Sequence, residues 1–419
     1  MPADAPIKAL LCALVADLAP AVHLINRLQP ETLCFFAPEA SRPLIEQRIQ
    51  QHITQMPRRW DWVVTPAPVE FPVSHQALTR SLPSLLETWG VQPGELVMGI
   101  VDVPAAMAAA MTLVGMSCSS RVVQLLPHEG DVSTLGEAEG ATDAWRWVQG
   151  NPWDEAAASV RREGGDLFNR GEYIGAAYLF RQLEQRVSGG QKPLYHALSD
   201  VAEGYGLWSR FQHRSAWEKL KTGCKSLEMA SLWGGPPGVK PLLPLLKANV
   251  GFLERIAMDP LEVKESLTID LLGHAARLTG QRNHPELVMR TVLRALESAA
   301  QWALLKRHQI KSWDVRPEQL PDRVQATGRT GYVSEVDGKY KLPLHAQFQV
   351  LAERGDELGK AYLAQWPKMK PLFDAADHAV LGHGAEAIKP ERCQQLFEMT
   401  MKLLGLTDSA LPKFPVLAL

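Results

Sequence analysis

The residues best suited to chemistry lie late in the chain, where His383 stands directly before Gly384. An imidazole titrates near neutral pH, so a histidine in a turn could act as a general acid or base. Ala376 and Asp377 stand seven and six residues before this histidine. A lone His-Gly pair is most often structural, so its meaning depends on the elements that position it.

The composition is that of a globular protein with two or three domains, at 419 residues, 46% hydrophobic and 21% charged. The formal net charge of -2 restricts any nucleic-acid site to a local patch. Five scattered cysteines without a CxxC pair argue against a disulfide framework and against a zinc site. They suit a reducing cytoplasm, the location expected for this protein. The apolar stretch from Val97 to Cys118 contains Asp102 and Pro104, which favours a strand, a turn and a helix over a membrane span.

Strand-like and helix-like segments alternate in the first part of the chain. Apolar runs at Ala9–Val15 and Thr32–Ala37 predict buried strands, while Ala21–Leu28 and Arg42–Gln51 have helical spacing. Alternation of this kind indicates a parallel sheet covered on both faces, so we expect a Rossmann-like domain over residues 1–140. Further strands are expected at Trp60–Thr65, Glu95–Val103 and Arg121–Leu126.

From about residue 150 the pattern is helical only, which predicts a helical region over 150–419. The domain boundary is expected within Pro127–Gly150. A polar segment near 319–341 reads as an irregular insert. The fold class is therefore α/β followed by all-α. The helices are expected at Gly164–Glu184, Leu194–Leu220, Glu262–Leu278 and Glu286–Leu305.

Several phrases of the helical region resemble, in order and spacing, those of one CRISPR-associated family. Its members carry a CARF sensor domain and a HEPN effector domain. Leu167–Ala177 (LFNRGEYIGAA) and Ala202–Phe211 (AEGYGLWSRF) carry the resemblance, as do Arg290–Gln301 (RTVLRALESAAQ) and Trp313–Val315 with Leu320–Pro321. The similarity runs from about Lys8 to Leu404. It implies a Rossmann-like CARF domain followed by a helical HEPN domain, and a role in antiviral defence.

The segment that ends in His383 and Gly384 resembles the Arg-Asn-x-Ser-Ile-Leu-Ala-His-Gly element of HEPN ribonucleases. In that element Arg and His, with six residues between them, form half of an RNA-cleaving site. Ala376 stands at the arginine position and Asp377 at the asparagine position, so the resemblance implies a site formed by Ala376, Asp377 and His383 that is inactive in this chain. The element's apolar pair, histidine and glycine are matched by Val380, Leu381, His383 and Gly384.

Such a site needs no metal and no cofactor. Single-stranded RNA carries its own nucleophile, the 2′-hydroxyl, and histidine supplies the general acid or base. Arginine's planar cation would stabilise the charge that grows on the phosphoryl oxygens. One histidine per chain cannot play both proton roles, so we expect a homodimer that brings two copies of His383 into one cleft. Ala376 should then lie about two turns before His383 on the same helix, and Ala376→Arg should restore cleavage if the alanine is an engineered replacement of arginine.

The resemblance also implies a cyclic oligoadenylate as activator, held by a turn after the first strand and a turn after a later one. Backbone N–H groups of such turns cradle phosphate. Here both turns contain a carboxylate and lack the family's glycines, so we expect weak binding or none. The positions concerned are Ala16, Asp17 and Leu18 in the first turn, and Asp102, Val103 and Pro104 in the second.

Two alternatives remain open. The first is a catalytically dead sensor or scaffold of a CRISPR system, since drift would explain all of the altered turns together. The second, a nucleotide-dependent oxidoreductase, is disfavoured because no G-x-G-x-x-G follows the first strand. A basic stripe could contact RNA phosphates, although a solvated helix face is the default reading. The stripe consists of Arg277, Arg282, Arg290 and Arg294.

Overall fold

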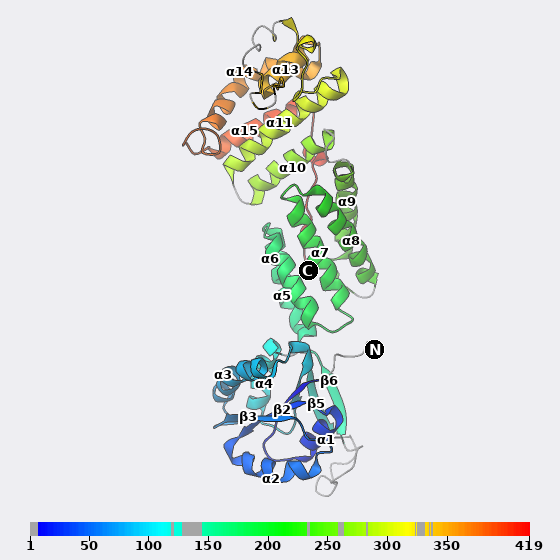
Figure 1. The fold of residues 1–419 in the computed structure, drawn as a ribbon, viewed down its shortest axis with the longest axis vertical. Coiled ribbons are helices and arrows are strands. Elements are labelled where there is room, and N and C mark those ends of the chain that lie inside the picture. The colour runs from blue at the N-terminus through cyan, green and yellow to red at the C-terminus, as the bar shows by residue number, and fades with distance from the viewer. Residues whose placement is uncertain are drawn as a thin grey trace. The chain divides into compact units, whose positions relative to one another are not determined.

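The chain divides into two compact units, described separately below: Met1–Glu163 with Tyr178–His196, and Gly164–Ala177 with Ala197–Leu419. The first unit contains a sheet, and the second is helical (Figure 1). The computed structural model describes residues 7–118, 121–127, 145–232, 235–258, 264–281, 284–322, 324, 332–334, 336 and 338–419.

The strands found among the described residues form one sheet in the order β3-β2-β1-β4-β5-β6. The first five strands run parallel, and β6 pairs antiparallel with β5. The expected parallel, Rossmann-like sheet is thus confirmed. The sheet reaches further than residue 140 because β6 lies beyond it, while residues 128–144 of the expected boundary lie outside the described residues. The strands are β1 (Ala9–Ala13), β2 (Thr32–Pro38), β3 (Arg59–Thr65), β4 (Leu96–Ile100), β5 (Val122–Pro127) and β6 (Trp145–Gly150).

Helices cover both faces of this sheet because successive strand side chains point to opposite sides. Leu11 packs with α3 (Phe71–Trp89) and α4 (Ala105–Cys118). Its neighbours Leu10 and Cys12 pack on the other face with two further helices. The stretch from Val97 to Cys118 forms β4, a turn and α4, as expected. The helices on the second face are α1 (Ala19–Leu28) and α2 (Arg42–His52).

Helices follow β6 throughout, and α5, α6 and α7 contribute residues to both units. The expected helix at Gly164–Glu184 is interrupted at Gly171, whose φ of 81° ends a helix, and the one at Leu194–Leu220 breaks at Phe211 (φ 59°). No helix in the described part is both long and apolar enough to cross a bilayer. The helices are α5 (Pro152–Asn169), α6 (Tyr173–Arg186), α7 (Lys192–Trp208), α8 (His213–Leu232), α9 (Leu243–Ala257), α10 (Glu265–Gln281), α11 (Pro285–His308), α13 (Leu344–Glu353), α14 (Glu357–Asp377) and α15 (Pro390–Leu403).

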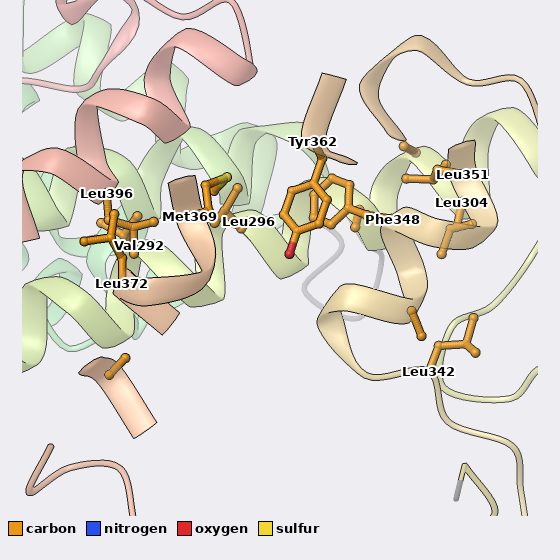
Figure 2. Packing of buried hydrophobic residues seen from close by; sticks show 14 of the residues in the cluster. Val292, Leu296, Leu304, Leu342, Phe348, Leu351, Tyr362, Met369, Leu372 and Leu396 are labelled. Carbon is orange, nitrogen blue, oxygen red and sulfur yellow. The ribbon is translucent and has the colours of Figure 1, made fainter. Parts of the chain in front are cut away.

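The helices after residue 284 share one hydrophobic core (Figure 2). Val292 and Leu296 of α11 meet Met369 of α14 there, and Leu396 of α15 is part of the same core. This packing fixes the end of α14 against α11, which is the part of the fold that presents His383. The expected insert near 319–341 forms isolated bridges from Tyr340 to residues 315 and 333, and its residues 323, 325–331, 335 and 337 lie outside the described residues.

The second unit also contains a buried ionic cluster around Asp270 of α10, whose side chain is fully buried. Its carboxylate accepts a hydrogen bond from Trp208 Nε1 at 2.7 Å and contacts His213 Nε2 at 2.8 Å. Arg277, about two turns further along α10 and mostly buried, lies 4.0 Å from the same carboxylate. A buried charge is tolerated only when it is paired. Trp208, His213 and Arg277 therefore all stabilise the buried carboxylate of Asp270.

Candidate functional site

His383 lies in a tight turn on the surface and not on a helix. Helix α14 ends at Asp377, and the chain then folds back so that the His383 N–H donates to the Asp377 carbonyl at 2.7 Å. The Glu386 N–H donates to the His378 carbonyl at 3.1 Å and closes the loop. The expectation that His383 continues the helix of Ala376 is therefore wrong. These hydrogen bonds satisfy carbonyls that the end of a helix leaves open.

Glycines make this turn possible by permitting close approach of main-chain atoms. A Cβ atom at Gly382 would overlap the Ala376 carbonyl, and one at Gly384 would overlap the His378 carbonyl. The His383-Gly384 pair is thus part of a folded turn whose shape depends on glycine. The imidazole of His383 itself is exposed.

Ala376 faces the other way. Its methyl group is fully buried in the core shared by α11, α13, α14 and α15. Ala376 and His383 consequently do not point into one cleft, because the backbone reverses direction between them. Asp377, the next residue, is exposed.

Two residues of α11 hold the turn, and sequence reasoning did not assign them this role. Arg290 Nη2 donates to the Ala376 carbonyl at 2.6 Å, and Glu286 Oε2 accepts from the Leu381 N–H at 3.3 Å. Arg290 Nε and Glu286 Oε1 are buried without a hydrogen-bond partner among the described residues. Their four-residue spacing on α11 places both on one face of the helix, which was the available signal.

The expected basic stripe does not form one surface. Arg290 is half-buried under the turn, Arg277 is mostly buried, and exposed Arg294 lies 3.4 Å from Glu297. Arg282 lies outside the described residues. On α15, burial and the nearby Glu286 carboxylate raise the pKa of the Cys393 thiol to about 11, which favours its protonated form.

The side chain of His383 is suited to proton transfer. The turn itself, residues 378–386, contains no lysine or arginine. The guanidinium nearest to the turn, that of Arg290, is engaged with a main-chain carbonyl. Among the described residues no cluster of histidine, cysteine or carboxylate side chains has the arrangement of a metal site.

The two turns of the sheet domain do come together. β1 and β4 are neighbours, and the Asp17 N–H donates to Asp102 Oδ2 at 3.3 Å. The Asp17 carboxylate in turn accepts from the Ala19 N–H at 3.0 Å. This place is the topological switch point of the sheet, where open α/β folds bind ligands. Here the carboxylates of Asp102 and Asp17 accept hydrogen bonds from main-chain N–H groups that would otherwise be available to a phosphate. The remaining turn positions, Ala16, Leu18, Val103 and Pro104, flank these two residues.

Comparison with known proteins agrees with this architecture. The family model for the Csm6 6H domain matches residues 158–253, and the model for the Csm6 HEPN domain matches residues 262–407. Together they span more than half of the 419 residues. No curated protein matches the chain by sequence.

A solved structure shares the fold over almost the whole chain. It is Enterococcus italicus Csm6 bound to cyclic hexa-2′-fluoro-hexa-dAMP, with a TM-score of 0.59 and 11% sequence identity. The match covers 98% of this chain and 95% of that one. The sheet with its switch point, the helical region and both family models lead to one conclusion: the chain belongs to the Csm6-type CARF–HEPN family.

Proposed function

We propose that this chain is a CRISPR-associated antiviral defence protein of the cytoplasm whose RNA-cleaving site is inactive. The arginine-bearing form of such a site would be a metal-independent endoribonuclease acting on single-stranded RNA. The observation that carries the proposal is the burial of Ala376 beneath the turn that exposes His383. The imidazole can move a proton, but the charge that develops on the phosphoryl oxygens has no arginine partner.

The proposed site belongs to a homodimer. Two copies of His383 would divide the roles of general base and general acid, which one imidazole cannot fill at once. The exposure of His383 in a surface turn supports this, because a second copy can approach it.

The first prediction concerns RNA cleavage, and His378→Arg is its main variant. Residue 378 is exposed, and its carbonyl is bonded within the turn of His383, so an arginine there could reach the same phosphate. We expect His378→Arg to cleave a fluorescent single-stranded RNA roughly two orders of magnitude faster than the native chain. The product should end in a 2′,3′-cyclic phosphate, and EDTA should not slow its formation.

The control is the double variant His378→Arg/His383→Ala, which should return to the native rate. Native activity equal to that of His378→Arg, and lost in His383→Ala, would contradict the proposed inactivity. No cleavage by any variant would favour the second candidate, a dead sensor or scaffold.

That second candidate has its own observation, the hydrogen bond from the Asp17 N–H to Asp102 at the switch point. A carboxylate already occupies the donor that the phosphate of a cyclic oligoadenylate would use. Evolutionary drift at both sites would preserve the fold but remove both RNA cleavage and the binding of a cyclic oligoadenylate. The two candidates therefore share the expectation that any cyclic oligoadenylate binds weakly to this chain.

Calorimetric titration with cyclic tri-, tetra- and hexa-adenylate tests the sheet domain. We expect the native chain to bind weakly or not at all, and Asp102→Asn to bind roughly tenfold more tightly, because it removes one charge beside the phosphate and keeps the side-chain shape. Glu31→Gln is the matched control. Glu31 is exposed and precedes β2, so it lies at the amino-terminal ends of the parallel strands, whereas Asp102 follows the carboxyl end of β4. Nanomolar binding by the native chain would show that other donors hold the ligand.

A further inference from the structure

Residues 411–419, termed the strap, lie extended against the helical bundle of the second unit. The strap forms no strand, and its contacts come from side chains. Asn169 of α5 forms two hydrogen bonds with Leu417, accepting from its N–H at 2.8 Å and donating to its carbonyl at 3.0 Å. An amide that meets both main-chain groups of one residue recognises an extended peptide independently of its side chain.

Two further buried donors bind main-chain carbonyls of the strap. Asn249 of α9 donates to the Lys413 carbonyl at 2.9 Å and to the Tyr205 hydroxyl at 2.8 Å. Arg277 donates to the Pro412 carbonyl at 3.1 Å. With the strap in place Asn249 is only 3% exposed, so its amide is shielded from water while it donates to the strap.

One side chain anchors the strap. The Phe414 ring lies 4.5 Å from that of Tyr205 and 4.9 Å from that of Trp208, and the Arg277 guanidinium carbon lies 3.9 Å from its centre. Rings at these separations attract one another, and a desolvated cation over a ring adds to the attraction. In contrast, Val416 is 69% exposed.

Glycines form the floor beneath the strap at three places. A Cβ atom at Gly273 of α10 would stand 2.9 Å from Pro412, and one at Gly165 of α5 would stand 3.0 Å from the Leu417 carbonyl oxygen. At Gly238 it would overlap the Ala418 carbonyl. These glycines come from separate elements, so the bundle is shaped along its length to accept a peptide main chain.

We propose that this groove is a peptide-binding site. Its ligand is an extended segment with an aromatic ring between two prolines, which the strap of the same chain supplies. The link from α15 to the strap is short and exposed at Thr407 and Asp408, so the strap connects the last helix of the HEPN region to α5, α7 and α9. This site is separate from the RNA chemistry proposed above.

The test uses the full chain with a protease recognition sequence inserted between Thr407 and Asp408, cut after folding. The strap should remain bound to the cut protein in gel filtration at micromolar concentration. A fluorescein-labelled peptide of residues 408–419 should exchange into the cut protein and bind intact chain at least roughly tenfold more weakly, because the cis strap has a high effective concentration. Equal binding to intact and cut protein, or immediate loss of the strap, would overturn the proposal.

Two unlabelled peptides provide the matched comparison. The peptide with Phe414→Ala should compete at least roughly tenfold more weakly than the peptide with Val416→Ala. Equal competition would contradict the anchor. If cutting unfolds the protein, hydrogen exchange on the uncut chain decides instead. There Phe414→Ala should expose the Leu417 amide and Val416→Ala should leave it protected, and equal protection in both variants would reject the site.

Discussion

Replacing Ala376 with arginine is expected to lower the free energy of unfolding by about 3 kcal/mol or more. The methyl group of Ala376 is fully buried among the helices of the HEPN region, in a core formed by hydrophobic side chains. An arginine must either bring its guanidinium into this hydrophobic core or push the end of α14 out of the core. Chemical denaturation of native and variant protein measures the difference.

Asp377→Arg is the control for this variant. It places the same side chain one residue later, at an exposed position in the last turn of α14, where a cation is favourable. Its stability should lie within about 0.5 kcal/mol of native. If Ala376→Arg is as stable as this control and cleaves RNA, position 376 faces the site after all and the turn described here is rearranged in the active form.

Removing the carboxylate of Asp270 is expected to destabilise the helical bundle by about 3–5 kcal/mol. Asp270→Ala leaves Trp208 Nε1 without its acceptor and leaves Arg277 as a buried cation without a counter-ion. Hydrogen exchange of α10 in increasing urea reports this loss locally, which avoids the assumption that the whole chain unfolds in one step.

Glu228→Ala provides the comparison, because its partner Lys247 and the carboxylate are both half-exposed. Such a surface pair contributes at most about 1 kcal/mol. Equal effects of the two substitutions would mean that Asp270 is not the charge on which the cluster depends. Loss of the cluster should also release the strap, since Arg277 contacts both Asp270 and Phe414.

Under the proposed function, the chain lacks the chemistry of both sites while it keeps the architecture of the family. In the proposed RNA-cleaving site Ala376 stands where the resemblance implies an arginine, and in the sheet domain Asp102 accepts a hydrogen bond at the switch point. Both differences act through charge: one removes a cation from a phosphoryl site, and the other adds an anion to a phosphate site. His378→Arg adds a cation near the first site, and Asp102→Asn removes the charge from the second.

The local pattern of apolar residues was sufficient to predict the parallel sheet of the first domain. Apolar runs such as Ala9–Val15 are long enough to be buried on both faces, and only a parallel sheet between helices buries them so. The sequence also singled out His383, Asp17 and Asp102 as candidate site residues, because residue types and family phrases mark these positions without reference to distant contacts. β6 escaped detection because an edge strand with exposed residues lacks a continuous apolar run.

Tertiary structure decided which way the site residues face. Helical spacing placed Ala376 and His383 on one side, but the helix ends at Asp377 because Arg290 and Glu286, about 90 residues earlier, bond to the main chain of the turn. The strap was likewise invisible, since its binding groups come from α5, α9 and α10. A helix propagates by bonds between near neighbours, whereas these bonds join residues far apart in sequence, so no local pattern records them.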